Sequence, residues 1–316
     1  MGFMISHWEF SQLNAICHSE DDTRTLDIHP EHWYHCERQH PDLRQWLLKN
    51  RIPSSIVKHF LSDESRPSFH QYDEQHFMLI LRGMNMNKNA TPEAMLSVRI
   101  LFYHGALIST LKVPSHAINE IQYQLSQHQG PKQLSELLIQ IIDGLNGNID
   151  KYFESVEQKI EAWSLEQKKP HALIPMQKTL LRMKRFIRPQ QYAIRDLAEA
   201  ELSLLSKHSH PLHHTLNNII RINETMDFYL GELELLKEEW HQYQEEKLSK
   251  NSYVFTIVAT IFLPASFLTG LLGVNIGGIP GTSSPFAFSI FCILLIALFL
   301  LELWLLRRMR FMSKSW

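Results

Sequence analysis

The chain has 316 residues, a formal net charge of −2 and 44% hydrophobic residues. The near-neutral charge argues against a nucleic-acid partner, which would need a basic face. Cys17, Cys36 and Cys292 lie far apart in the sequence without a CxxC pair, which excludes a disulfide framework and a thiolate zinc cluster. There is no nucleophile elbow, phosphate loop, HExxH motif or pair of catalytic carboxylates, so we do not expect an enzyme.

Residues 1–113 are typical of a mixed α/β domain in which a small sheet packs against helices. Two helices are predicted, one beginning at Pro41 and one over Arg51–Leu61. Five segments have the composition of strands: Met4–Phe10, Thr25–Ile28, Phe77–Leu81, Met95–Tyr103 and Ala106–Val113. His104-Gly105 is expected to form the tight turn between the last two strands.

Residues 114–252 are predicted to form long helices. Apolar residues recur with a 3.6-residue period in Pro131–Glu166, and a second long helix is expected over Met176–Lys207. Nothing breaks the chain from Leu212 to Leu272, which predicts one helix of 61 residues. Its first part carries a heptad seam. The seam consists of Ile219, Ile222, Met226, Tyr229, Leu233, Leu236, Trp240 and Tyr243. The seam can pack between copies of the chain or on the chain's own helices.

Two apolar runs follow, and both are long enough to cross a bilayer. Tyr253–Leu272 has 20 residues and Phe286–Leu306 has 21, so each spans roughly 30 Å as a helix. The loop between them, residues 273–285, has no charge. The sequence therefore predicts a multi-pass membrane protein with two transmembrane helices, 253–272 and 286–306, surrounded by membrane lipid.

The positive charges give the orientation. The flanks of the apolar runs carry Lys247, Lys250, Arg307, Arg308, Arg310 and Lys314, whereas the loop carries neither Lys nor Arg. By the positive-inside rule, both termini, the α/β domain and the basic tail 307–316 are cytoplasmic and the loop is external.

The loop begins with Gly273-Val274-Asn275 and continues as GVNIGGIPG through Gly281. This GxN motif at the outer end of the first of two C-terminal spans resembles the CorA family of divalent-cation transporters, whose usual motif is Gly-Met-Asn. The longer string resembles the ZntB-like zinc-transporter branch. Similar short runs occur at His40-Pro41-Asp42, Glu64–Pro67 and Leu81–Asn85, so the resemblance covers nearly the whole chain.

The resemblance implies a CorA-like, funnel-shaped homopentamer in the bacterial inner membrane. Five copies of the first span would line the pore and the second spans would lie outside them. The chemistry of the loop agrees, because the Asn275 side chain and the carbonyls of Gly273 and Val274 can bind a hydrated ion through oxygen without fixed charge. The alternative is that these residues form only a tight turn between the spans.

One face of the first span leads to the GxN motif. It carries Ser252, Phe255, Ala259, Leu263, Ser266, Gly270 and Gly273 at helical spacing. These residues can line a pore, with Phe255 and Leu263 as hydrophobic constrictions, or they can permit close helix packing. We expect Thr256, Thr260 and Thr269, on other faces, to bond their own backbone.

Two further groups are candidates for cation binding in the cytoplasm. Glu238 is 14 residues before Ser252 and near the same helix face, so it is a candidate for an acidic ring, although a solvated helix face explains it equally well. Histidines are abundant, at 18. They concentrate at His29, His32, His35 and His40, and at His208, His210, His213 and His214. These can form a regulatory metal site, or they can be ordinary surface residues.

The function predicted is transport of a divalent cation, with zinc favoured over cobalt, magnesium and nickel, and proton coupling left open. No cofactor is expected beyond the transported ion. One alternative is a magnesium or cobalt channel of the CorA type. The other is a membrane-tethered metal sensor or scaffold that does not conduct.

Overall fold

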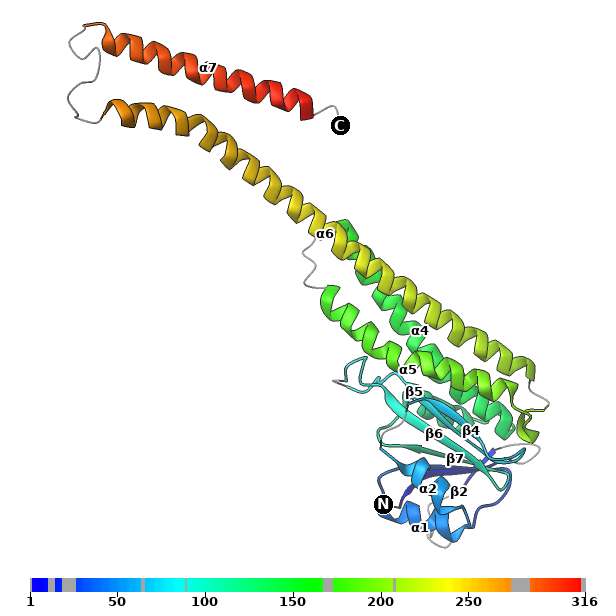
Figure 1. The fold of residues 1–316 in the computed structure, drawn as a ribbon. Helices are drawn as coiled ribbons and strands as arrows, with labels where there is room; N and C mark the ends of the chain where they lie inside the picture. Colours follow the sequence, from blue (N-terminus) through cyan, green and yellow to red (C-terminus); the bar gives the residue numbers. More distant parts are fainter. Residues whose placement is uncertain are drawn as a thin grey trace. The chain divides into compact units, whose positions relative to one another are not determined.

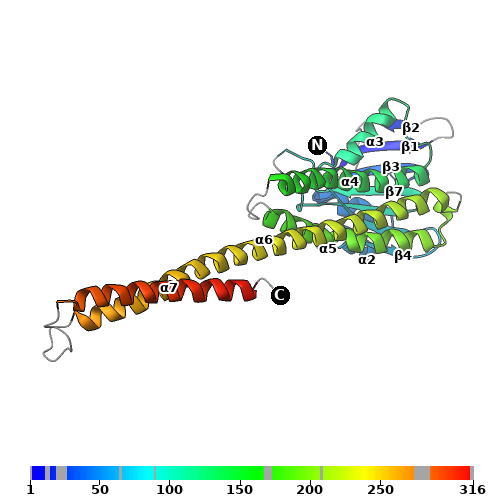
Figure 2. The ribbon, with the colours of Figure 1, turned by 90° about the horizontal axis from the view of Figure 1, so that it is seen from above.

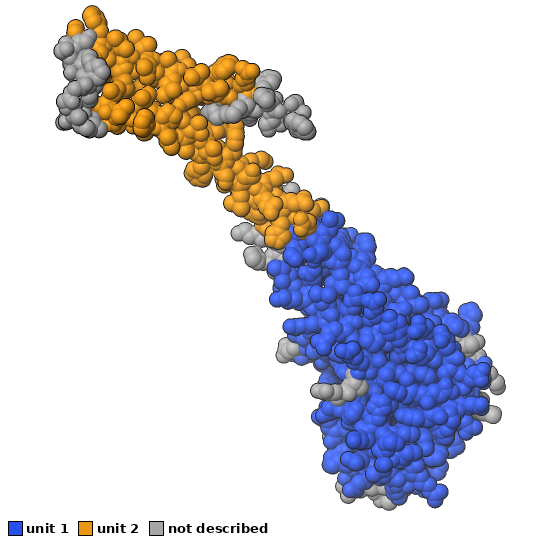
Figure 3. Space-filling model, viewed as in Figure 1, with its two compact units in different colours: residues 1–237 blue, residues 238–316 orange. Residues whose placement is uncertain are grey.

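The computed structural model describes residues 2–10, 15–18, 27–63, 66–88, 90–166, 173–206, 209–273 and 285–313. The chain divides into two compact units, residues 1–237 and 238–316 (Figure 3). The first unit contains a seven-stranded sheet and the helices around it. The second contains the end of the long helix α6 and the helix α7.

The strands form one mixed sheet in the order β2-β1-β3-β7-β6-β5-β4. Their bounds are β1 Met4–Phe10, β2 Ala15–His18, β3 His32–Glu37, β4 Ser68–Gln71, β5 Phe77–Gly83, β6 Leu96–Tyr103 and β7 Ala106–Leu111. The pair β3–β7 is parallel and the other pairs are antiparallel. His104 and Gly105 both have positive φ, 52° and 73°, as a two-residue hairpin turn requires, which confirms the predicted turn.

Helices cover both faces of this sheet (Figures 1 and 2). The helices in this unit are α1 Pro41–Lys49, α2 Ser54–Leu61, α3 His116–Ser126, α4 Leu134–Glu166 and α5 Leu173–Glu199, with the start of α6. Alternate residues of one strand enter different cores, as the two-residue period of a strand requires. Leu79 packs with α3, α4 and α5, whereas Ile80 packs with α1 and α2. This arrangement confirms the predicted sheet packed against helices.

Three strands, β2, β3 and β4, were not predicted, and the described part of one predicted strand is not a strand. Of the predicted strand Thr25–Ile28 the structure describes Asp27 and Ile28, and neither is in a strand. The Ile28 N–H donates to Oδ1 of Asn50 at 2.7 Å, so a side chain takes the hydrogen bond that a neighbouring strand would have made.

The predicted helix Met176–Lys207 was too long, because α5 ends at Glu199. The short 3₁₀ turn η2, Ser203–Leu205, follows it. Both the backbone N–H and the hydroxyl of Ser203 donate to the carbonyl of Glu74, at 3.0 and 3.1 Å. These bonds hold the chain after α5 against the turn between β4 and β5. Lys207 lies outside the described residues.

The long helix α6 is continuous over Ser209–Leu272, which confirms the prediction of one helix through Leu272. Within the first unit it packs on α4 and α5. Thr215 donates to Asp143 at 2.7 Å and Arg221 pairs with Asp150 at 2.6 Å. The seam is buried at Ile219, Ile222, Met226, Tyr229 and Leu233. The seam therefore packs on the chain's own helices over these five positions.

His35 gives the first unit a dependence on pH that can be measured. Its ring is fully buried, with Nδ1 2.8 Å from the hydroxyl of Ser109, and burial lowers the pKa of His35 to about 4. An unfolded histidine takes up a proton near pH 6.5. The unfolded state therefore binds more protons between pH 6.5 and 4, and the chain loses stability as the pH falls through that range, by about 3 kcal/mol for this residue.

We expect His35→Gln to flatten this pH dependence, because glutamine can bond Ser109 but does not titrate. The measurement is urea unfolding of the full-length protein in detergent at pH 7, 6, 5 and 4, followed by tryptophan fluorescence. The same substitution at an exposed histidine, His116→Gln, is the matched control. If His35→Gln lost stability with falling pH as steeply as the unsubstituted protein, the assignment of this effect to His35 would be wrong.

Candidate ion-conduction site

The second unit contains two segments long and apolar enough to cross a membrane. One is the C-terminal part of α6 and the other is in α7, Ala287–Ser313, over residues Ala287–Leu305. No residue in the most apolar stretch of either helix is buried inside the protein. Such surfaces need lipid or other subunits around them.

Within this unit α6 has one partly covered face. It comprises Ile257, Ile261, Pro264, Ala265 and Leu268. On α7 the covered positions also recur at helical spacing: Ala287, Phe291, Cys292, Leu295, Leu298, Glu302 and Leu303. The pattern is that of two helices that each turn one face inward within the unit.

The candidate pore residues lie on the opposite face of α6. All seven, from Ser252 to Gly273, are exposed. At about 100° per residue, their mean direction is roughly 180° from that of the partly covered face. Phe255 and Leu263 have 74% and 69% of their surface accessible, so the described part of the chain leaves both largely uncovered. This face is available to line a pore or to meet another subunit.

The end of α6 is set by Gly273, which donates its N–H to the carbonyl of Thr269 at 2.9 Å. A Cβ at Gly273 would lie 3.0 Å from that carbonyl oxygen, which is tighter than an ordinary contact, so the absence of a side chain permits this turn. A Cβ at Gly270 would meet nothing within 4 Å, so steric demand does not explain the glycine there. Val274 and Asn275 lie outside the described residues.

The three threonines of the span behave as predicted. The hydroxyls of Thr256, Thr260 and Thr269 donate to the carbonyls four residues earlier, at 2.8, 2.8 and 3.0 Å. Their polar groups are satisfied within the helix, as a membrane helix requires. Thr269 also donates to the backbone carbonyl of Ser266, at 3.0 Å, and this bond does not involve the Ser266 hydroxyl on the candidate pore face.

Two carboxylates of the second unit differ in their surroundings. Glu238 is exposed, and among the described residues no ion pair involves it, whereas Glu246 pairs with Lys250. Glu302 on α7 is buried and its Oε1 has no hydrogen-bond partner in the part of the chain that the structure describes. A carboxylate inside a membrane helix is expensive to bury.

The rings of His29 and His32 lie with centroids 5.7 Å apart, whereas the other histidines that the sequence grouped have different surroundings. His32 and His35 lie on opposite faces of β3, and His35 is buried against Trp33 and Ser109. The ring of His40 accepts the N–H of Asp42 at the start of α1. His210, His213 and His214 are exposed, and His208 lies outside the described residues.

His32 also lies close to two histidines that sequence spacing did not suggest, His7 of β1 and His18 of β2. Only strand pairing brings them together: His7 pairs with His18 in one register and with Tyr34 in the other. The composition of Met4–Phe10 indicated one strand, but no sequence pattern gave the register between strands.

Comparison with known proteins gives a consistent result. A family described as CorA-like Mg2+ transporter protein matches residues 32–308. The Zinc transport protein ZntB of Vibrio parahaemolyticus serotype O3:K6 is 55% identical over 315 residues, which is 100% of this chain and 99% of that protein. The crystal structure of the ZntB cytoplasmic domain from Vibrio parahaemolyticus is 52% identical, with a TM-score of 0.75, over 78% of this chain and 100% of that one. The structure of full-length CmaX is 25% identical, with a TM-score of 0.83, over 97% of this chain and 98% of that one.

The two faces of α6 can be told apart by chemical access. In a chain with Cys17, Cys36 and Cys292 replaced by alanine, we expect Ser266→Cys in liposomes to react with a charged, water-soluble thiol reagent much faster than Ala265→Cys. A pore brings water to the first position, and water supports the reactive thiolate, whereas the neighbouring position is partly covered. Equal rates at the two positions would contradict a pore along this face.

Proposed function

The chain belongs to the CorA-like Mg2+ transporter family, and from that premise we propose that it conducts zinc across the bacterial inner membrane. The observation that carries the choice of zinc is the 55% identity, over the full length, to a protein named as a zinc transporter. The family is one of transporters rather than enzymes. A transported divalent cation is therefore its substrate, and no separate cofactor enters the mechanism.

We propose a homopentamer in which α6 lines the pore and both termini are cytoplasmic. Two spans of one chain cannot enclose a pore, and the face of α6 from Ser252 to Gly273 is left uncovered by the protomer. The apolar side of that face, at Phe255 and Leu263, would restrict the water-filled path. The charges that flank the spans support the orientation.

The proposed entrance is the GxN motif, Gly273-Val274-Asn275. A doubly charged ion holds its water strongly, so uncharged oxygen acceptors can receive the hydrated ion without stripping it. The loop sequence 273–281 contains no Cys or His, the ligands that zinc prefers, so the entrance would bind loosely and release quickly. Loose binding is what conduction requires. Glu238, if it repeats around the assembly, would raise the cation concentration on the cytoplasmic side.

The decisive measurement is cation flux into liposomes that contain the full-length protein, with zinc, cobalt, nickel and magnesium compared. We expect zinc to enter fastest and Asn275→Ala to slow it roughly 10–100-fold, because hydrogen bonds to a charged group contribute about 1.5–3 kcal/mol each. Asn251→Ala, before the membrane span, is the matched control. A faster magnesium flux would identify a magnesium channel of the same family instead.

The assembly is tested separately. Native mass spectrometry in detergent should give a particle of five 37.1 kDa chains. A monomer or dimer that reconstitutes without flux of any cation would overturn the transport proposal and favour a membrane-tethered sensor.

A further inference from the structure

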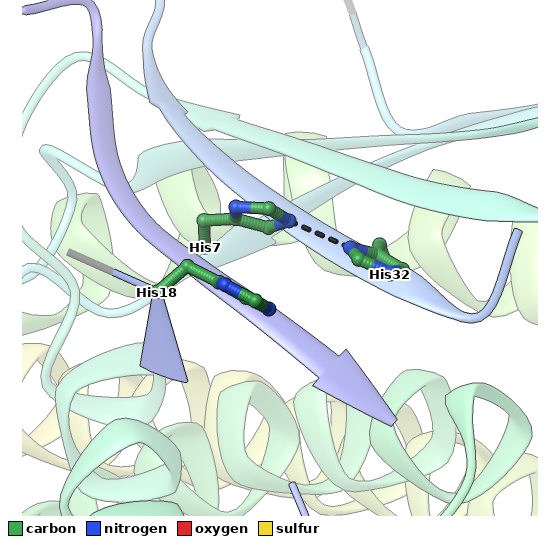
Figure 4. Close-up of side chains that lie close together, drawn as sticks. All are labelled: His7, His18 and His32. Carbon is green, nitrogen blue, oxygen red and sulfur yellow. Dashed lines mark hydrogen bonds between the residues drawn. The ribbon is translucent and has the colours of Figure 1, made fainter. Parts of the chain in front are cut away.

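Three histidines on three neighbouring strands converge at one end of the sheet (Figure 4). His7, His18 and His32 each offer one ring nitrogen, and these three atoms lie within 4.8 Å of one another. His7 Nε2 is 2.7 Å from His32 Nδ1, and the rings of His7 and His18 stack with centroids 4.6 Å apart. The residues come from β1, β2 and β3, so the backbone of the sheet fixes their spacing.

The distances suit a small metal ion. Zinc bound by three imidazoles at about 2.0–2.1 Å places the ligand nitrogens roughly 3.3 Å apart in a tetrahedron. The distance between His7 Nε2 and His32 Nδ1, 2.7 Å, has to lengthen slightly. The widest distance between ligand atoms, up to 4.8 Å, has to shorten by about 1.5 Å. We infer that His7, His18 and His32 form a zinc site in the first unit of the chain, separate from the ion path.

A carboxylate completes the ligand set. Glu9 lies on the same strand as His7, two residues away and therefore on the same face of the sheet. Its Oε2 is 3.0 Å from Nε2 of His18. This carboxylate can take the fourth tetrahedral position or orient the His18 ring by accepting its N–H, as carboxylates around zinc commonly do.

The hydrogen bond between His7 and His32 can give way to a metal. Zinc binds a neutral imidazole through a free nitrogen lone pair. One proton lies between His7 and His32 in the metal-free form, because one of two neutral rings must donate to the other. On metal binding that proton moves to the far nitrogen of its ring, and both facing lone pairs bind zinc.

The position of the site has a mechanical consequence. β2 is the edge strand, with only four residues, Ala15–His18, and it contacts the sheet through β1. A zinc ion shared by the three strands would tie this edge to β3, which β2 does not otherwise pair with. The site would therefore order the edge of the sheet in response to the zinc concentration around the first unit. Imidazole ligands suit Zn²⁺, whereas Mg²⁺ prefers carboxylate, carbonyl and water oxygens, so the abundant Mg²⁺ should not compete.

The test counts zinc ions on the full-length protein in detergent. After equilibration with zinc and removal of free ion, the unsubstituted chain should hold one more zinc per chain than His7→Gln/His18→Gln, measured by elemental analysis. His116→Gln, an exposed histidine of the same unit, is the control and should keep the full count. Cobalt should give the intense visible absorption of a tetrahedral site in the unsubstituted protein and lose it in the double variant.

The single variant His18→Gln guards against loss of folding, because His18 is half-exposed on the edge strand. Equal zinc counts in the unsubstituted protein and both variants would overturn the inference and leave the rings as packing groups against Tyr34. The inference is independent of the transport proposal. Asn275→Ala should slow flux and keep the site, whereas His18→Gln should lose the site in a protein that still assembles.

Discussion

The structure depends on one helix, α6, which must be stable both in water and in a membrane. α6 runs without interruption over Ser209–Leu272, and its sequence changes from a heptad seam with charged flanks to a run with no charge. In the first unit its apolar side is covered by α4 and α5. In the second unit most of its apolar surface is uncovered. A helix with both properties suits a chain that passes from water into a bilayer.

The heptad seam of α6 shows where the helix changes from covered to uncovered. Its first five positions, Ile219 to Leu233, are buried within the first unit. Further along, Leu236 and Trp240 are partly covered and Tyr243 has 57% of its surface accessible. The same heptad pattern therefore serves the chain's own packing at one end and leaves apolar groups free at the other. The free end is where association between copies would bury further surface.

Periodicity made the long elements predictable and side-chain partners made the short ones unpredictable. The 3.6-residue period located α4 and the heptad seam located the first part of α6, whereas strand-like composition located β1, β5, β6 and β7. β3 was missed because the sequence HWYHCE places a buried histidine where alternation would need an apolar residue. That histidine is acceptable only because Ser109, 74 residues away, bonds it. No local pattern contains that information.

The candidate conduction face was predictable for a different reason. Its seven residues belong to one helix, so spacing alone defines the face, and the structure leaves that face exposed. The histidine cluster belongs to three strands, and its members are 11 and 14 residues apart in the sequence. A site made by one helix can be found from a sequence, whereas a site made by a sheet needs the register of every strand that contributes to it.

The two metal sites inferred for this chain call for opposite chemistry. An ion that must pass needs weak, uncharged oxygen ligands and its own water, because tight ligands would hold it in the path. An ion that reports its concentration needs nitrogen ligands in a fixed geometry, so that occupancy follows concentration. Gly273-Val274-Asn275 has the first set of ligands and His7, His18 and His32 have the second. A chain that carries both can move zinc at one place and bind it at another without either function limiting the other.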